Sequence, residues 1–325
     1  MSGDDVYTVT FGFRAVAHAG TESVGDAPIT SLGPREQIAL YRKLKQRGVA
    51  CELVDLRLLL PEGAPTAGRP RPLTEQELRA IDELRFGPDY PIPKPAAFTL
   101  VVPDGVGQLV QGVDHDALYA EATRMHKDTR VWMKGRVVDK IARHGTTLAD
   151  FSQEPDYEAK KGSVHNFADY PAFAALREAV AELLGVPAAH LMGELNHYYD
   201  GAQCGIGFHG DRTRAISKDP QHGDVYQGGF TAGVRLGPGA DNFPLRYQWY
   251  HCKRAVGKMG ELHLKRSDLY VMDAKAMGGD FLRSSIKTVR HAAGRHPKWA
   301  KLTGVMKKHG GGDWPKTRLY PKPRA

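Results

Sequence analysis

The tripeptide His-Gly-Asp, whose imidazole and carboxylate could together hold a metal ion, occurs twice in close succession. It occupies positions 209–211 and again positions 222–224. In an extended chain the side chains of residues i and i+2 point to the same side, so this spacing brings both groups to one ion. The spacing is the same in both copies, so the choice between them depends on the residues around each.

Those surroundings favour the first copy as a metal site. His209 ends the apolar, glycine-rich segment 205–208, whereas His222 lies in a polar loop. A third ligand has to come from a distant part of the chain, and we expect it to be His291, which is 291 − 209 = 82 residues further on. The predicted ligands are therefore His209, Asp211 and His291, and the second copy is expected to be a solvated loop.

Two histidines and one carboxylate form a facial triad, which leaves three coordination positions open. Such a site suits Fe(II) that must also bind a cosubstrate and O₂. A thiolate zinc site is not expected, because the three cysteines, Cys51, Cys204 and Cys252, include no Cys-x-x-Cys pair. So few cysteines favour a reducing intracellular environment, in the cytoplasm or the nucleus.

The motifs around the triad give the chain a resemblance to a known family. Their order resembles that of the AlkB-like Fe(II)/2-oxoglutarate-dependent dioxygenases, and most closely a branch found in large DNA viruses and some protists. The resemblance covers about residues 130–300. It depends on Tyr198-Tyr199-Asp200, the segment 204–211 (CGIGFHGD), Arg235-Leu236-Gly237, Tyr247-Gln248-Trp249, the segment 268–272 (DLYVM) and the segment 290–294 (RHAAG).

The resemblance implies an α+β fold whose core is a double-stranded β-helix, or jelly roll, with flanking helices and an α/β N-terminal extension. It implies that His209, Asp211 and His291 bind Fe(II), and that Asn196 and Tyr198 hydrogen-bond the cosubstrate 2-oxoglutarate. O₂ is the second cosubstrate. The implied activity is hydroxylation or demethylation of a methylated or methyl-bearing base in DNA or RNA.

The sequence departs from the family pattern where the far carboxylate of 2-oxoglutarate should be bound. The family usually has an arginine on the strand after the distal histidine, with a second arginine six positions later. Here Lys301 and Lys307 keep that spacing. A lysine supplies the charge but not the bidentate fork of an arginine. We expect Lys301 to bind the carboxylate, with Lys298 second and Arg295 third.

A second departure follows the first His-Gly-Asp copy. This branch of the family tends to have Glu-Arg there, whereas the chain has Arg212-Thr213-Arg214. Arg212, Arg214 and Lys218 are predicted to contact substrate phosphates, with solvated surface charge as the alternative.

Hydrophobic periodicity and turn residues predict the elements that position these side chains. Helices are expected over about 34–47, from Thr74, over about 114–127 and over 171–184. Strands are expected at 52–60, at 97–102 and in the short glycine-punctuated segments after Gly193. The expected parts are an N-terminal α/β extension of unknown role over 1–95, a dioxygenase domain over 96–308 and a basic tail over 309–325. The N-terminal half is expected to pack on the C-terminal β-sandwich and to supply strands to it.

The overall composition is that of a soluble protein with a polyanionic partner. The 325 residues have a net charge of +8, and Lys307–Arg324 contain six basic residues and one acid. No apolar run approaches the roughly 20 residues of a membrane span. No secretory signal is expected either. Nucleic acid is the favoured partner, and the pattern leaves the oligomeric state open. The alternatives are the same chemistry on a protein or small molecule, and a non-catalytic nucleic-acid-binding jelly-roll protein.

Overall fold

The structure is a computed structural model, and it describes most of the chain in several segments. These are residues 5–13, 32–60, 74, 76, 96–133, 135–211, 216–219, 223–226, 229–281, 283 and 285–294. Strands dominate the described residues and lie mainly in two sheets, so the fold is of the α+β class.

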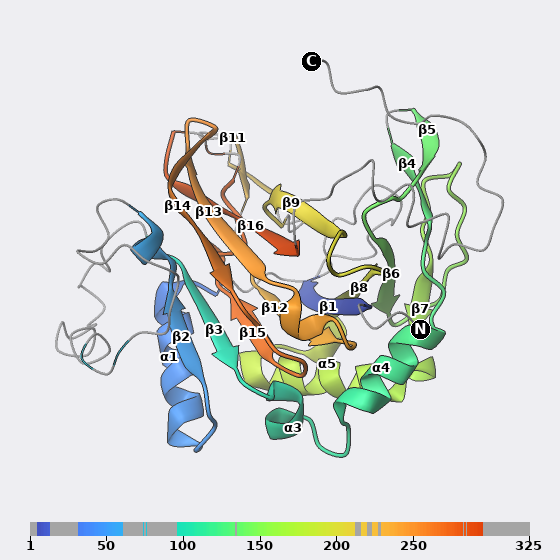
Figure 1. Cartoon of the computed structure of the whole chain (residues 1–325), viewed down its shortest axis with the longest axis horizontal. Coiled ribbons are helices and arrows are strands. Elements are labelled where there is room, and N and C mark those ends of the chain that lie inside the picture. Colours follow the sequence, from blue (N-terminus) through green and yellow to red (C-terminus); the bar gives the residue numbers. More distant parts are fainter. Residues whose placement is uncertain are drawn as a thin grey trace.

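The larger sheet has eight strands and combines segments from the whole length of the chain (Figure 1). Its order is β2-β3-β15-β12-β1-β8-β6-β7. The strands are β1 (Val6–Phe13), β2 (Glu52–Asp55), β3 (Phe98–Val102), β6 (His144–Ala149), β7 (Val164–Asn166), β8 (Leu191–Tyr198), β12 (Thr231–Leu236) and β15 (Leu269–Met272). The N-terminal strand β1 pairs with β12 on one side and β8 on the other, so it lies inside the sheet and not at an edge.

The second sheet has four strands in the order β14-β13-β16-β9. They are β9 (Gly205–His209), β13 (Leu245–His251), β14 (Arg254–Leu262) and β16 (Thr288–Gly294). Two hairpins stand apart from both sheets: β4 (Arg130–Met133) with β5 (Arg136–Asp139), and β10 (Ile216–Asp219) with β11 (Gly223–Tyr226).

Helices cover one face of the larger sheet, and the smaller sheet covers the other (Figure 1). The helices are α1 (Pro34–Gln46), α3 (Gly105–Leu109), α4 (His115–Arg124) and α5 (Pro171–Leu184). Their buried side chains, such as Leu44 and Phe173, pack with alternate strand residues, such as Val9 and Val234, in the largest core cluster. A second cluster, which includes Tyr270 of the larger sheet and Tyr247 of the smaller sheet, lies between the two sheets.

Strand β12 shows how the alternation of side chains divides these two faces. Ala232, Val234 and Leu236 lie in the helix-side core. Thr231, Gly233 and Arg235 must therefore point to the opposite face, toward the smaller sheet, because successive strand residues alternate. That face is buried although two of these three residues are polar, with Thr231 and Arg235 exposing 6% and 0% of their surfaces.

Several predicted elements are confirmed. The predicted helix over 171–184 is α5, which begins with proline and ends at Gly185 in the left-handed conformation (φ 66°).

The predicted strand over 52–60 is correct only in its first half, because β2 ends at Asp55 and a 3₁₀ turn over Leu56–Leu59 follows. The Asp55 carboxylate accepts a hydrogen bond from the backbone N–H of Arg57 at 2.8 Å, which favours the turn over further strand.

Strands β1 and β2, which lie in the predicted N-terminal extension, both belong to the larger sheet. The three-part domain division remains a prediction. Most of the helix predicted from Thr74 lies outside the described residues, and so does the basic tail.

Candidate metal centre

The two predicted histidine ligands are direct neighbours across the smaller sheet. Strands β9 and β16 run antiparallel, and His209 is the register partner of His291. Their ring centroids lie 4.4 Å apart. A cross-strand pair in an antiparallel sheet points to one face, so the pairing brings both imidazoles to the same side.

Asp211 joins this pair from the chain just after β9. Its backbone N–H donates to the carbonyl of Met277 at 2.9 Å, which fixes the chain as it leaves the strand. The intervening Gly210 is packed tightly, and a Cβ built there would lie 2.5 Å from the carbonyl oxygen of Gly278 and 2.7 Å from the Phe281 ring. The close contact of position 210 with Gly278 and Phe281 therefore leaves room for glycine but not for a residue with a Cβ atom.

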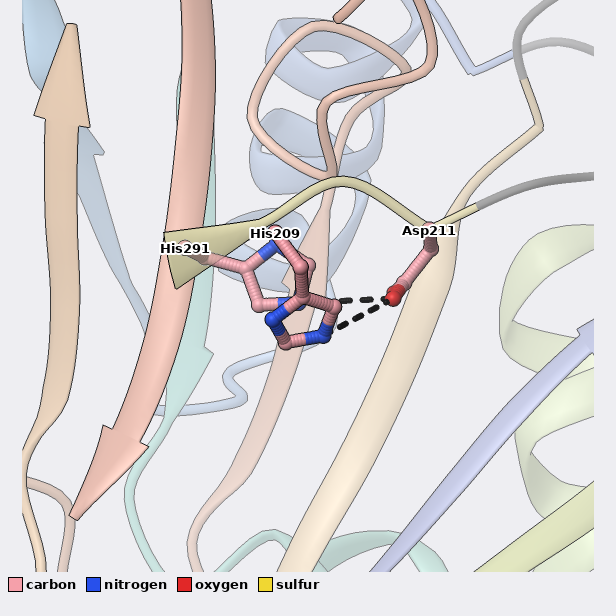
Figure 2. Close-up of side chains that lie close together, drawn as sticks. All are labelled: His209, Asp211 and His291. Atoms are coloured by element: carbon pink, nitrogen blue, oxygen red, sulfur yellow. Dashed lines mark ion pairs between the residues drawn. The ribbon is translucent and has the colours of Figure 1, made fainter. Parts of the chain in front are cut away.

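Figure 2 shows the three side chains converging, with both imidazoles directed at one carboxylate oxygen. The Nε2 atoms of His209 and His291 lie 3.4 Å and 3.5 Å from Oδ1 of Asp211. The three ligand atoms all lie within 4.8 Å of one another. Ligand bonds of about 2.1 Å at right angles place adjacent donor atoms ~3 Å apart, so the arrangement fits one face of an octahedral ion.

Neighbouring groups orient two of the ligands. Nδ1 of His209 lies 2.9 Å from the carbonyl oxygen of Gly207, and an N–H there leaves the Nε2 lone pair for the metal. The Thr231 hydroxyl donates to Oδ2 of Asp211 at 2.7 Å. That bond occupies one carboxylate oxygen and leaves Oδ1 as the single donor atom for an ion.

The electrostatics of the cluster favour the protonation states that bind a metal. Burial raises the pKa of the Asp211 carboxyl, but the His291 and His209 imidazoles outweigh burial and hold that pKa well below its usual range. Burial lowers the pKa of His209, and the neighbouring His291 lowers it further. At neutral pH these shifts favour an ionised aspartate and a neutral His209 imidazole, which are the forms that bind a metal.

The predicted cosubstrate residues Asn196 and Tyr198 lie on β8 and are buried. The Asn196 carboxamide already has protein partners, because its oxygen accepts from Arg143 at 2.7 Å and its nitrogen donates to Glu194 at 3.1 Å. The Tyr198 ring packs on Phe243, with ring centroids 4.5 Å apart. The role of Asn196 and Tyr198 toward 2-oxoglutarate stays a prediction.

Other predicted site residues lie outside the described residues: Lys301, Lys298, Arg295, Arg212 and Arg214. His222 of the second His-Gly-Asp copy lies outside them too. Its neighbour Asp224 is placed in the β10–β11 hairpin opposite Lys218. Within the described part of the chain, a cluster of potential metal ligands forms at the first copy.

The sequence interpretation assigned no role to two residues on the β12 face that points to the smaller sheet. Thr231 holds a ligand oxygen, as described above. Arg235 is fully buried, and no atom of its guanidinium group has a hydrogen-bond partner among the described residues. The alternation of Thr231, Gly233 and Arg235 with three aliphatic residues predicts a strand with a polar face, which normally indicates a solvent-facing side.

Comparison with known proteins finds a viral relative and no matching family model. No protein-family model matches the chain. The chain is 29% identical to an uncharacterized protein of Acanthamoeba polyphaga mimivirus over 290 residues, which cover 89% of this chain and 96% of the viral protein. No helix in the described segments has the length and apolar character needed to cross a membrane.

Proposed function

We propose that the protein is an Fe(II)- and 2-oxoglutarate-dependent dioxygenase. The observation that carries the proposal is the donor set, in which two imidazole Nε2 atoms and one carboxylate oxygen converge from one side. Because Thr231 occupies the other oxygen of Asp211, the protein supplies three donor atoms and leaves three positions for a bidentate 2-oxo acid and O₂.

The arrangement of the two sheets supports the same proposal. The triad lies where the smaller sheet, through β9 and β16, faces Thr231 of the larger sheet. This agrees with the jelly-roll core with iron at its mouth that the family resemblance implies. The described order of strands is compatible with that core, in which β1 serves as an internal strand of the larger sheet.

The residues of the chain bind and orient the reacting groups. His209, Asp211 and His291 would hold the iron, and Gly207 and Thr231 would fix the direction of two of these ligands. The iron and 2-oxoglutarate together supply an oxidation in which 2-oxoglutarate and O₂ become succinate and CO₂ while one oxygen atom enters a substrate C–H bond.

The proposed substrate is a methylated or methyl-bearing base in nucleic acid. The net charge of +8 supports a polyanionic partner. Hydroxylation of an N-methyl group releases formaldehyde and the free base, and a C-methyl group such as that of thymine becomes hydroxymethyl. A base within a duplex would have to be flipped out of the stack to reach the metal.

Mass spectrometry of nucleosides tests this proposal directly. Oligonucleotides with N-methylated and C5-methylated bases would be incubated with the full chain, Fe(II), ascorbate and 2-oxoglutarate. We expect demethylated or hydroxymethylated nucleosides to form in proportion to succinate. With His209→Ala we expect neither the modified nucleosides nor succinate. Succinate formation that no oligonucleotide stimulates would instead support a protein or small-molecule substrate.

A binding measurement separates the nucleic-acid substrate from the alternatives. Contacts to phosphates release counterions, so affinity for an oligonucleotide should fall steeply between about 50 mM and 200 mM salt. Affinity that is absent at low salt would contradict a nucleic-acid partner. Strong binding without stoichiometric Fe(II), Mn(II) or Ni(II) would favour the non-catalytic binding protein.

A further inference from the structure

Arg235 carries a buried positive charge whose guanidinium group forms no salt bridge or hydrogen bond with the described residues. The residue exposes 0% of its surface, and Nε, Nη1 and Nη2 all lack a hydrogen-bond partner among the described residues. Burying an ion is unfavourable unless it is paired and hydrogen-bonded, and buried polar groups in folded proteins nearly always have partners. A fully unpaired guanidinium group therefore indicates a missing anionic partner.

In the described part of the chain, aromatic and hydroxyl groups surround Arg235, and no ion pair with it is present. Its guanidinium carbon lies 5.0 Å from the centre of the Phe243 ring, which gives a cation–π contact. Burial lowers the pKa of Arg235, and electrostatic interactions with Tyr270, Tyr198 and Tyr247, and more weakly with Asp268, oppose that shift. The Asp268 carboxylate already accepts backbone N–H groups from Asp104 and Lys265 at 3.0 Å and 2.7 Å.

The position of Arg235 relative to the metal ligands is set by one strand. Thr231, which hydrogen-bonds Asp211, and Arg235 lie four residues apart on the same face of β12, about 13 Å along the strand. Between them is Gly233, which has no side chain. The Tyr270 ring lies against it, since a Cβ built there would be 2.5 Å from the Tyr270 hydroxyl. Tyr270 interacts electrostatically with both Asp211 and Arg235, so its hydroxyl is near the metal ligands as well as the buried cation.

The strand order of the larger sheet limits where a basic residue that binds the far carboxylate of 2-oxoglutarate could lie. The sequence predicts this basic residue on a strand after His291, at Lys301. The interior position between β12 and β8 is taken by β1, which is hydrogen-bonded to both. A further strand can join this sheet only at its edges, β2 and β7. Arg143, which precedes β6 beside β8, already donates to Asn196.

We propose that Arg235 binds the distal carboxylate of the 2-oxo acid whose other end chelates the metal, and so makes the site selective for a dicarboxylic 2-oxo acid. This inference rests on the proposed function. A guanidinium fork can donate two parallel hydrogen bonds to a carboxylate, which a lysine cannot do. Arg235 is thus a binding and specificity residue that takes the place expected for Lys301, Lys298 or Arg295.

The test compares two ligands that differ only at the distal end. Calorimetry would measure binding of 2-oxoglutarate and of 2-oxopentanoate, which lacks the distal carboxylate, to the full chain loaded with Mn(II). The wild type should bind 2-oxoglutarate at least ~100-fold more tightly, because that ligand alone neutralises the buried charge. In Arg235→Met the preference should fall below about 3-fold, through loss of 2-oxoglutarate affinity alone.

Two variants act as controls. Arg246→Met removes a buried arginine from β13. Tyr247 is the register partner of His291, so the adjacent Arg246 points to the opposite face of the smaller sheet, away from the metal ligands. The variant should therefore retain the wild-type preference. Arg235→Lys keeps the charge and should recover part of the preference. Without ligand, Arg235→Met should melt at or above the wild-type temperature, because an unpaired buried charge has been removed.

The outcomes separate this inference from the proposed function. If Arg235→Met binds Mn(II) and still prefers 2-oxoglutarate, or if the wild type binds the two acids equally, the role of Arg235 is wrong while the metal site stands. If the wild type binds neither Mn(II) nor a 2-oxo acid, the proposed function itself is wrong. If Arg235→Met does not fold, partial loss of preference in Arg235→Lys supports the inference, and full retention there overturns it.

Discussion

His209 and His291 lie opposite each other on adjacent antiparallel strands, although 82 residues (291 − 209) separate them in the chain. Sheet pairing therefore assembles the candidate metal centre, and the tight packing of the chain after β9 adds Asp211. Two glycines beside these ligands differ sharply in the space around them, and this difference supplies the first prediction.

Gly210→Ala should disrupt the site, whereas Gly207→Ala should leave it intact. A Cβ at Gly210 would collide with the Gly278 carbonyl oxygen and the Phe281 ring, while a Cβ at Gly207 would meet nothing within 4 Å. We expect Gly210→Ala to lower the free energy of unfolding by about 1–3 kcal/mol and to weaken Mn(II) binding at least ~10-fold. Chemical denaturation and Mn(II) titration check both effects, and similar behaviour of the two variants would contradict the packing described here.

Thr231→Val should weaken metal binding without unfolding the protein. The variant keeps the shape of the side chain but removes the hydroxyl that holds Oδ2 of Asp211 at 2.7 Å. Loss of a group that orients a metal ligand typically lowers affinity about 10–100-fold. Mn(II) titration measures the change, with Thr123→Val on the exposed surface of α4 as the matched control. Equal Mn(II) affinity in both variants would show that Thr231 does not orient the aspartate.

His144 should make the protein less stable in mild acid. Burial lowers its pKa to about 4, with smaller contributions from His197, Lys140 and Lys127. Because the folded state disfavours the charged imidazole, this stability is fully present above about pH 6.5 and is lost as the pH falls toward 4. The loss amounts to about 3 kcal/mol at most.

Denaturation curves of His144→Asn and the wild type between pH 7 and pH 4 check this expectation. The variant should lose less stability over that range, whereas His263→Asn, which changes an exposed histidine, should follow the wild type. Parallel curves for all three proteins would show that His144 does not contribute to the acid sensitivity.

Local signals explain which elements could be predicted from the sequence. Helix α5 was predictable because its proline, apolar spacing and final glycine act within the helix itself. The triad was predictable from the setting of His209 and from the family motifs, and the structure brings its three residues together. The role of iron remains a proposal.

Long-range pairing explains what the sequence did not reveal. The place of β1 between β12 and β8 depends on pairing with strands about 180 to 230 residues away, which leaves no local pattern. The burial of Arg235 has the same origin. Arg235 lies on the polar face of β12, and in a single sheet that face would point to solvent. The face is buried only because the second sheet covers it.

The most direct test of the central claim is the visible absorption spectrum of the protein with Fe(II) and 2-oxoglutarate under anaerobic conditions. Chelation of Fe(II) by a 2-oxo acid produces a charge-transfer band that neither component shows alone. We predict this band at one equivalent for the wild type and for His222→Ala, and its absence for His209→Ala and His291→Ala. No band in the wild type, or a full band in His209→Ala, would contradict the assignment of His209, Asp211 and His291 as the iron site.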